Sequence, residues 1–562
     1  MTNEKRVCEA TRAQRRRALR LGLKGLSAAA FFGLGGICAA QDEGAREAAG
    51  GGMGAEAQSG RSPSASKDLH GASGFIDYSP AGHPVDISAD AEEVWDVVVI
   101  GSGAAGLAAA LEARRAGARV VLLEKMGSIG GNSVLSEGLV GIPGSPMQKA
   151  LGIHDSPELY AQDLLASGYV SHPARVRVLA QKALETFEWT RRELGVRWWD
   201  DRLEYEIGQS VRRAAVIREA NGGGLIYPLY ERAAALGVVI RLRTKALHFL
   251  EAARADGSRR VAAVLAEDLA DGRVIILRAR RGVVLASGGF SSDIDFRQMQ
   301  NWRLSARVGS ATQPGSTGEM LREAARIGAW LLHLEYIHCI PDASPDEKGW
   351  GTTWKFSRYC AATQGVWVVR QTGRRFVNET GDNVDKTNAI FDLLNAGKTP
   401  VAIADANAVR HPQSVLFGPQ DVETLVARGF VSRYPTLEAL AAGMRIPIDA
   451  LRATVERYNA SLRQKASEDE MGRPPSALAE PMTTGPWYAS SMLTKVLMCS
   501  GGIATDTCAR ALSVVDDQPI PGLYAAGEVT GGLHGIAYVG SSGLLDALVF
   551  GRIAGQCVAA DG

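Results

Sequence analysis

The sequence contains little cysteine and no paired cysteine motif. Its seven cysteines are scattered. They form neither a C-x-x-C pair, which would bind zinc or act as a dithiol, nor the C-x-x-C-H motif that attaches haem. We therefore expect mostly buried thiols, and we assign no metal ligand.

An excess of either charge is also missing. The 62 Lys and Arg residues nearly balance the 61 Asp and Glu residues, which gives a formal net charge of +1. A nucleic acid partner is not expected, since such partners require a strongly basic surface. We expect a small-molecule substrate instead.

The N-terminal region lacks an apolar run long enough for a permanent membrane span. The uncharged run from Gly25 to Ala40 has 16 residues, compared with roughly 20 in a spanning helix. Arginines precede it, and Arg16-Arg17 resembles the twin-arginine export signal, although Arg20 replaces an apolar residue usual there. Residues 1–40 are therefore predicted to be a signal peptide, and the protein is expected to be periplasmic or otherwise exported. A basic disordered tail is the alternative.

Glycine, in contrast, is abundant. The chain has 64 glycines in 562 residues, about 11% against a usual ~7%. Many tight turns and close approaches of the backbone to a ligand are expected. Residues 41–93 are rich in Gly, Ala, Ser and Asp without apolar periodicity, and we predict a flexible linker there.

A nucleotide-binding βαβ unit follows this linker. Residues 95–100 are a continuous apolar strand, residues 101–106 read G-S-G-A-A-G, residues 107–116 favour a helix, and a second strand ends before Glu124. In this pattern Gly101 makes the turn, Gly103 admits the pyrophosphate to the helix N-terminus, and Gly106 allows close helix–strand packing. Glu124 is expected to accept hydrogen bonds from the adenosine ribose.

Two further segments favour FAD over NAD. The stretch from Gly130 to Ser133 would bring additional amides and hydroxyls to the pyrophosphate through Gly131, Asn132 and Ser133. Near the C-terminus, an apolar strand ends in Gly527-Glu528, which suits the far end of a long extended cofactor. We therefore predict non-covalent FAD.

The sequence resembles the family of fumarate reductase and succinate dehydrogenase flavoproteins, which includes flavocytochrome c, urocanate reductase and 3-ketosteroid dehydrogenase relatives. Six motifs match in order. They are DVVVIGSGAAGLAAA (96–110), LLEKMGSIGGNS (122–133), VVLASGGF (283–290), GSTGEM (315–320), GRRFVNE (373–379) and GLYAAGEVTGGLHG (522–535).

The resemblance implies further contacts with the flavin nucleotide. Beyond the residues already named, these are Ala105, Gly138, Ala246, Glu319, Gly543 and Leu544, and we add Lys125, Ser287, Gly288 and Met498. Leu544 begins an apolar helix whose N-terminus would favour negative charge on the reduced flavin, and which must also be a core helix.

Electrons are expected from a separate carrier. No second strand–GxGxxG–helix unit follows residue 150, so NAD(P)H is not expected as a bound redox partner. Flavocytochrome c relatives carry a haem domain, whereas this sequence has no haem motif. A cytochrome or a quinone-linked protein is the predicted partner.

The chain departs from the fumarate reductase pattern at the positions that clamp a dicarboxylate. Ile340 replaces a substrate histidine, Leu497-Met498 replaces a His-His pair, Asp382 stands in place of a relay arginine, and Tyr538 replaces a loop arginine. The pocket is thus expected to be more apolar, and fumarate is not the expected substrate. An aromatic, enone or steroid-like substrate, or a monocarboxylate, would suit it.

Three side chains are candidates for the chemistry. Glu379 ends the F-V-N-E motif, and Arg410 lies near the position of the family's proton-donating arginine. The Tyr538 phenol can hydrogen-bond a carbonyl or supply a proton, as tyrosines at the comparable loop do in the ketosteroid enzymes. Each has a structural alternative: Glu379 can fix a loop, Arg410 can be an exposed helix residue, and Tyr538 can pack in a lid.

We predict an α/β fold with a discontinuous Rossmann-like FAD-binding domain (94–335 and 498–562) and an inserted α+β capping domain (336–497). The leading hypothesis is an FAD-dependent oxidoreductase acting on a CH–CH bond, as an exported reductase of an activated C=C bond in an enoate or enone other than fumarate. The alternatives are a dehydrogenase of a ketosteroid-like or cyclic ketone and a non-catalytic flavin-binding partner subunit.

Overall fold

The computed structural model describes residues 89–347, 349, 351, 353–410, 419–464, 468–473 and 480–561. The predicted signal peptide and nearly all of the predicted linker lie outside the described residues.

An eight-stranded sheet carries the predicted nucleotide-binding unit. β1 (Ala91–Ile100) pairs in parallel with β2 (Val120–Leu123) on one side and with β8 (Val274–Leu285) on the other. The remaining strands are β5 (Val239–Arg241), β6 (Thr244–Ala253), β7 (Arg259–Asp268), β18 (Arg510–Leu512) and β19 (Pro519–Ala525). The sheet thus joins segments from both ends of the described chain.

The apolar run of β1 is covered on both faces, which is typical of a central parallel strand. Val97 and Val99 pack in a core with helices α2 (Ala104–Arg115) and α14 (Gly543–Ala560). Val98 and Ile100 pack on the opposite face, in a core with residues of β6 to β8. Alternating side chains therefore serve two separate cores.

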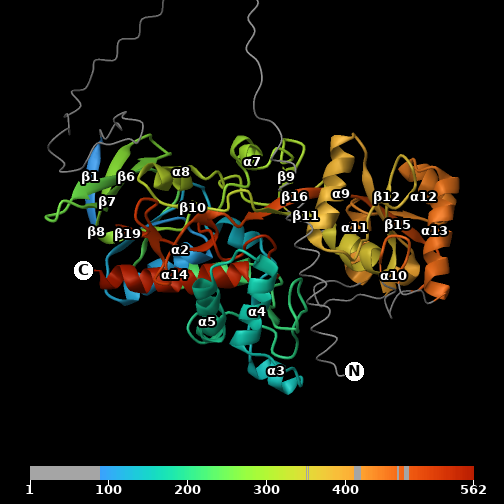
Figure 1. Ribbon diagram of the computed structural model, residues 1–562, viewed down its shortest axis with the longest axis horizontal. Helices are drawn as coiled ribbons and strands as arrows, with labels where there is room; N and C mark the ends of the chain where they lie inside the picture. Colours follow the sequence, from blue (N-terminus) through green and yellow to red (C-terminus); the bar gives the residue numbers. More distant parts are fainter. Residues whose placement is uncertain are drawn as a thin grey trace, which may run out of the picture. The chain divides into compact units, whose positions relative to one another are not determined.

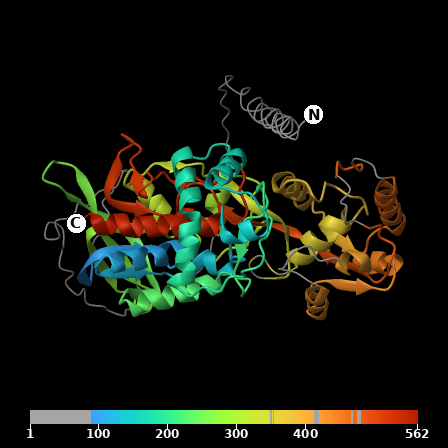
Figure 2. The same cartoon turned by 90° about the horizontal axis from the view of Figure 1, so that it is seen from below.

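Helix α14 lies alongside α2, as both views show (Figures 1 and 2). Gly551 and Gly555 make this approach possible, because a Cβ on them would lie 2.5 Å from the Ala105 carbonyl oxygen and 2.3 Å from that of Ala109, respectively. Among the described helices, α14 is the one long and apolar enough to cross a membrane, but 67% of it is buried in the protein. Its packing is that of a core helix.

Shorter elements complete this part of the structure. The helices are α3 (Pro146–Ala150), α4 (Pro157–Gly168), α5 (Pro173–Arg192), α6 (Gly223–Ala235), α7 (Ile294–Gln300) and α8 (Glu319–Arg326). Two small sheets pair β3 (Leu139–Gly141) with β4 (Ala214–Val216) and β10 (Leu331–Leu332) with β17 (Gly502–Ile503). Single turns are η1 (Gly131–Leu135) and η3 (Gly527–Val529).

The region predicted to form the cap has its own sheet and cores. Its strands lie in the order β12 (Val366–Val369), β13 (Pro400–Ala404), β15 (Trp487–Ser491) and β14 (Ser432–Tyr434). Around them lie η2, a π-helix (Phe356–Ala362), α9 (Asn383–Asn395), α10 (Ala406–Arg410), α11 (Pro419–Ala427), α12 (Leu437–Met444) and α13 (Ile448–Arg463) (Figure 1).

Two adjacent strands connect this region to the rest. β11 (Ile337–Ala343) enters it and β16 (Leu493–Cys499) leaves it, and the two pair antiparallel, with β9 (Gly309–Ser310) parallel to β16. A two-strand connection is the arrangement expected for an inserted domain. The predicted limits of the cap, 336 and 497, fall at this pair, and the exact limits stay a prediction.

The helix contact gives a test of the packing. Gly551→Ala places a methyl group against the Ala105 backbone, so the free energy of unfolding should fall by about 1–3 kcal/mol. Gly127→Ala is the control, because its Cβ meets nothing nearer than the Arg243 side chain at 3.5 Å. Thermal unfolding of both variants measures the difference; equal stability of the two would contradict close packing of α2 and α14.

Candidate active site

One long cavity receives most of the residues predicted for FAD. All the predicted cofactor residues line it except Gly106 and Gly138, and both of these adjoin lining residues. Gly106 is required by packing, since a Cβ there would lie 1.8 Å from the Gly101 carbonyl oxygen. The cavity wall is therefore assembled from segments distant in the sequence.

The nucleotide end is a turn that only glycine can make. Gly101 has φ +104°, and a Cβ on it would lie 2.3 Å from the Ala286 carbonyl oxygen. This turn opens the N-terminus of α2 toward the cavity, where backbone amides favour an anion. Glu124 lies beside it, held by hydrogen bonds from the Ser102 amide (3.1 Å) and hydroxyl (2.6 Å).

The predicted residues from both ends of the chain are bonded to one another. The Asn132 amide donates to Glu528 (2.8 Å), and the Asn132 oxygen accepts from the Gln313 amide (2.9 Å) and the Ser316 hydroxyl (3.0 Å). Glu528 also accepts from the Cys499 amide (3.0 Å). These hydrogen bonds connect three segments that line the cavity, those around Asn132, Gln313 and Glu528.

A partly exposed ion pair forms another part of the wall. Lys125 donates to Glu319 (2.8 Å) and to the Thr317 hydroxyl (2.6 Å). Burial opposes ionisation of Glu319, but the hydrogen bonds from Lys125 and Thr317 outweigh it and lower its pKa to about 2. This carboxylate therefore stays charged at neutral pH.

The residues present fit an FAD molecule. The Ser287 hydroxyl is buried and has no hydrogen-bond partner within the described residues. Ser287 lines the cavity, so a bound ligand can supply that partner. Gly288 next to it has φ +76° and open space where a Cβ would point. With the amides at the start of α2, these groups can hold the cofactor's phosphates and ring system.

The other end of the cavity has an apolar wall with a phenol. Four of the five positions where the sequence departs from a dicarboxylate clamp line it, namely Ile340, Leu497, Met498 and Tyr538. The fifth, Asp382, caps the N-terminus of α9 and does not line the cavity. The Tyr538 hydroxyl oxygen accepts from the Gly543 amide (3.2 Å), and burial raises the Tyr538 pKa to about 12. Tyr538 is thus a neutral hydrogen-bonding group here.

Four charged residues at this end were not predicted from the sequence: Glu137, Glu206, Asp342 and Arg358. Glu137 does carry a sequence signal, since it lies between Ser133 and Gly138, both predicted for the cofactor. Arg358 lies in the π-helix η2, outside the six motifs. Glu206 lies in the long connection between α5 and β4. Their positions follow from tertiary folding alone.

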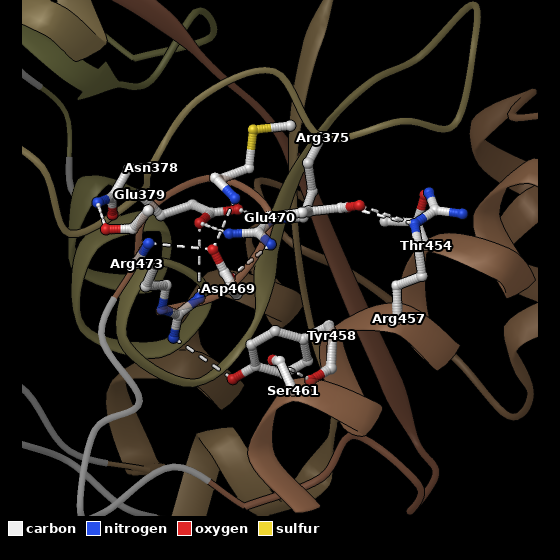
Figure 3. Close-up of polar contacts among 12 residues, drawn as sticks. Arg375, Asn378, Glu379, Thr454, Arg457, Tyr458, Ser461, Asp469, Glu470 and Arg473 are labelled. Carbon is white, nitrogen blue, oxygen red and sulfur yellow. Dashed lines mark hydrogen bonds and ion pairs between the residues drawn. The ribbon is translucent and has the colours of Figure 1, made fainter. Parts of the chain in front are cut away.

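Glu379, one of the three predicted catalytic residues, does not line the cavity. It is 1% exposed and accepts hydrogen bonds from Arg375 (2.8 and 2.6 Å) and from the Trp367 amide (3.0 Å). Arg473 lies 3.6 Å away (Figure 3). The contacts of Glu379 are therefore those of a carboxylate that stabilises the fold of the cap.

Arg410, another of the three, also lies away from the cavity. It ends α10, is exposed, and lines a separate shallow depression with Glu423 and Tyr488. The structure therefore brings Tyr538 to the cavity and leaves Glu379 and Arg410 outside it. No cluster of three or more His, Cys, Asp or Glu that could hold a metal occurs among the described residues.

The roles of Glu379 and Arg410 can be separated by stability. Glu379→Gln removes the buried counter-charge that Arg375 and Arg473 share, so the free energy of unfolding should fall by about 3–5 kcal/mol. The remaining Asp469 still pairs with the Arg375 guanidinium (2.7 Å). Arg410→Ala, the exposed control, should change it by less than about 0.5 kcal/mol. Urea unfolding measures both. A lost kcat with unchanged stability in either variant would favour the catalytic role predicted from the sequence.

The chain matches known proteins along most of its length. The family model described as FAD binding domain matches residues 96–544. The acrylate reductase flavoprotein subunit of Shewanella woodyi is 32% identical over 510 residues, which cover 87% of this chain and 98% of that protein. The urocanate reductase of Eggerthella lenta is 32% identical over 83% of this chain and 74% of its own length.

A solved structure confirms the predicted α/β fold. The open conformation of a flavocytochrome c3 fumarate reductase superposes with a TM-score of 0.71 at 27% identity, and covers 84% of this chain and 78% of that one. The resemblance inferred from the six motifs is thereby confirmed. This chain belongs to the FAD binding domain family, among the FAD-dependent oxidoreductases that act on CH–CH bonds.

Proposed function

We propose that the protein reduces the C=C bond of an α,β-unsaturated monocarboxylate, with electrons from a separate carrier. The observation that carries this proposal is the single guanidinium at the apolar end of the cavity. Arg358 lies there beside the rings of Trp354 and Tyr359, at 5.9 and 5.7 Å from their centroids. A fixed guanidinium matches a carboxylate in shape and charge.

Charge counting favours one carboxylate over two. The other basic residues that line the cavity are Lys125 and Lys245, and both lie beside Glu319, at 2.8 and 3.8 Å. Among the described lining residues, Arg358 is thus the one cation at the apolar end. A second carboxylate there would meet Ile340 or Leu497, and burying it without a cation is unfavourable.

The chain's own groups then have distinct tasks. FAD, when bound and reduced by the separate carrier, would supply the hydride for the reduction. Arg358 holds the substrate carboxylate, and its pull on electrons polarises the conjugated C=C bond. Ile340, Leu497 and Met498 pack against the carbon skeleton and exclude water. A proton for the second carbon must come from an acid in the same cavity.

A ketosteroid-like dehydrogenase is the less favoured alternative. A neutral ketone needs a hydrogen-bond donor such as Tyr538, but it offers the half-buried Arg358 no negative charge. The Arg358–Glu206 pair, at 3.8 Å, is too long for a hydrogen bond, so Arg358 retains donors for an anionic ligand.

Non-covalent FAD is part of the proposal. The one cysteine among the lining residues is Cys339, and burial raises its pKa to about 12. The thiol is therefore neutral and a poor nucleophile at physiological pH. No histidine occurs among the described residues that line the cavity.

A test replaces the proposed anchor. Arg358→Ala should raise KM for acrylate by about 10- to 100-fold, as expected for charged hydrogen bonds worth about 1.5–3 kcal/mol. Arg358→Lys keeps the positive charge but loses the paired N–H donors of the guanidinium. Its KM for acrylate should lie between that of Arg358→Ala and that of the wild type. Anaerobic assays with reduced viologen measure the values. Arg307→Ala, an exposed arginine, is the control; an unchanged KM in Arg358→Ala would rule out this anchor.

Export to the periplasm is proposed on the sequence alone. A chain that loads FAD before export benefits from a route that carries folded proteins, and the arginine pair is the feature such a route reads. Replacing Arg16 and Arg17 by lysines should leave the full-length protein in the cytoplasm, as cell fractionation would show. Periplasmic protein at the wild-type level in this variant would exclude the twin-arginine route.

A further inference from the structure

Three carboxyl groups gather at the substrate end of the cavity. Glu137 lies between η1 and β3, Glu206 lies before β4, and Asp342 lies on β11. All three line the cavity. Glu206 and Asp342 are also buried, with 6% and 3% of their surface exposed. They come from three separate segments, so the cluster is a product of the fold.

Two of these carboxyls have an oxygen that is shielded from water and lacks a hydrogen-bond partner. These atoms are Oε1 of Glu137 and Oδ1 of Asp342. A buried carboxyl oxygen left in this way is costly unless a ligand or a bound proton compensates it. The described residues show no metal-binding cluster here, so a metal ion does not account for them.

The cations near the cluster are not evenly distributed. Arg358 forms its ion pair with Glu206, at 3.8 Å, and the buried Lys386 lies where its charge acts on Asp342. Neither Glu137 nor Asp342 forms an ion pair among the described residues, and the charges of Arg358 and Lys355 also act on Glu137. Arg358 is thus the one cation paired within a cluster of three carboxyls, so a bound proton is expected on at least one of them.

Burial raises the pKa of all three carboxyls. Burial and the charge of Glu206 raise the pKa of Glu137 to about 8. The other charged groups that act on it are Asp342, which raises the pKa further, and Arg358 and Lys355, which lower it. Glu137 is therefore protonated at neutral pH and loses its proton on the alkaline side.

Glu137 also lines the cavity next to residues predicted to hold the cofactor. The predicted cofactor residues Ser133 and Gly138 flank it in the sequence, and Ser133 lines the same cavity. Tyr538 is close enough for the Glu137 charge to raise its pKa. Because that pKa is about 12, the phenol is a weaker acid than Glu137.

We propose that Glu137 is the general acid of the reduction, an inference that rests on the proposed function. One carbon of the C=C bond gains the hydride, and the electron pair of the broken π bond takes the proton of the Glu137 carboxyl at the other carbon. The product is the saturated carboxylate. Glu137 is left as a carboxylate and regains a proton from solvent before the next turnover.

The experiment uses the FAD-loaded protein and compares Glu137→Gln with the wild type. The glutamine keeps the size of the side chain but cannot donate a carboxyl proton. We expect kcat for acrylate to fall by about 10²–10⁴-fold, the range for a lost general acid. The affinity of the oxidised holoenzyme for acrylate, read from the flavin absorbance without turnover, should change less than about threefold, because Arg358 remains.

The pH profile gives an independent measurement. Wild-type kcat should decline above a pH of about 8 as Glu137 ionises, and this decline should be absent from the residual activity of Glu137→Gln. Glu206→Gln removes the neighbouring negative charge, so its decline should move to lower pH. Glu335→Gln, an exposed carboxyl elsewhere on the protein, should behave as the wild type.

Failure of the two proposals can be told apart. Wild-type enzyme that reduces no enoate overturns the proposed function and this inference together. Wild-type turnover with an unchanged kcat in Glu137→Gln overturns the inference alone. If Glu137→Gln does not retain FAD, Glu137→Asp replaces it in the test. The aspartate keeps a carboxyl group, so kcat of this variant should still decline at alkaline pH. A kcat that does not decline at alkaline pH in either Glu137→Asp or the wild type would contradict the role.

Discussion

The hydrogen bond from Asn132 to Glu528, 2.8 Å long, joins the two ends of the described chain across the cavity. Glu528 follows β19, and β19 joins the central sheet by pairing with β8, which in turn pairs with β1. The same register places α14 against α2, where Gly551 and Gly555 leave no room for a side chain. The shape of the cofactor cavity therefore depends on long-range backbone packing.

This construction separates two kinds of surface. The nucleotide end is made of turns and helix termini whose geometry glycine dictates. The substrate end is made of side chains, among them Ile340, Tyr538 and Arg358, that different segments supply. A protein of this kind can keep its cofactor site while its substrate changes, because the two sets of residues overlap little. The particular combination found here is an apolar wall with one guanidinium and a cluster of three carboxyls.

The sequence predicted the cofactor end well because its signals are local. An apolar run, a G-x-G-x-x-G turn and an acid at the end of the next strand specify β1, α2 and Glu124 within one short segment. Glu379 and Arg410 were selected by motif position, and the structure leaves both outside the cavity. Arg358 could not be found, since η2 has no motif and its approach to the cavity depends on how β11 and β16 pair.

The most direct measurement is the reoxidation of photoreduced, FAD-loaded protein after anaerobic mixing with candidate acceptors. The account predicts rapid reoxidation by a monocarboxylate such as acrylate and slow or absent reoxidation by fumarate, because Arg358 is the one cation among the described residues that line the substrate end. Reoxidation by no enoate, together with reduction of the oxidised protein by a saturated ketone, would contradict it.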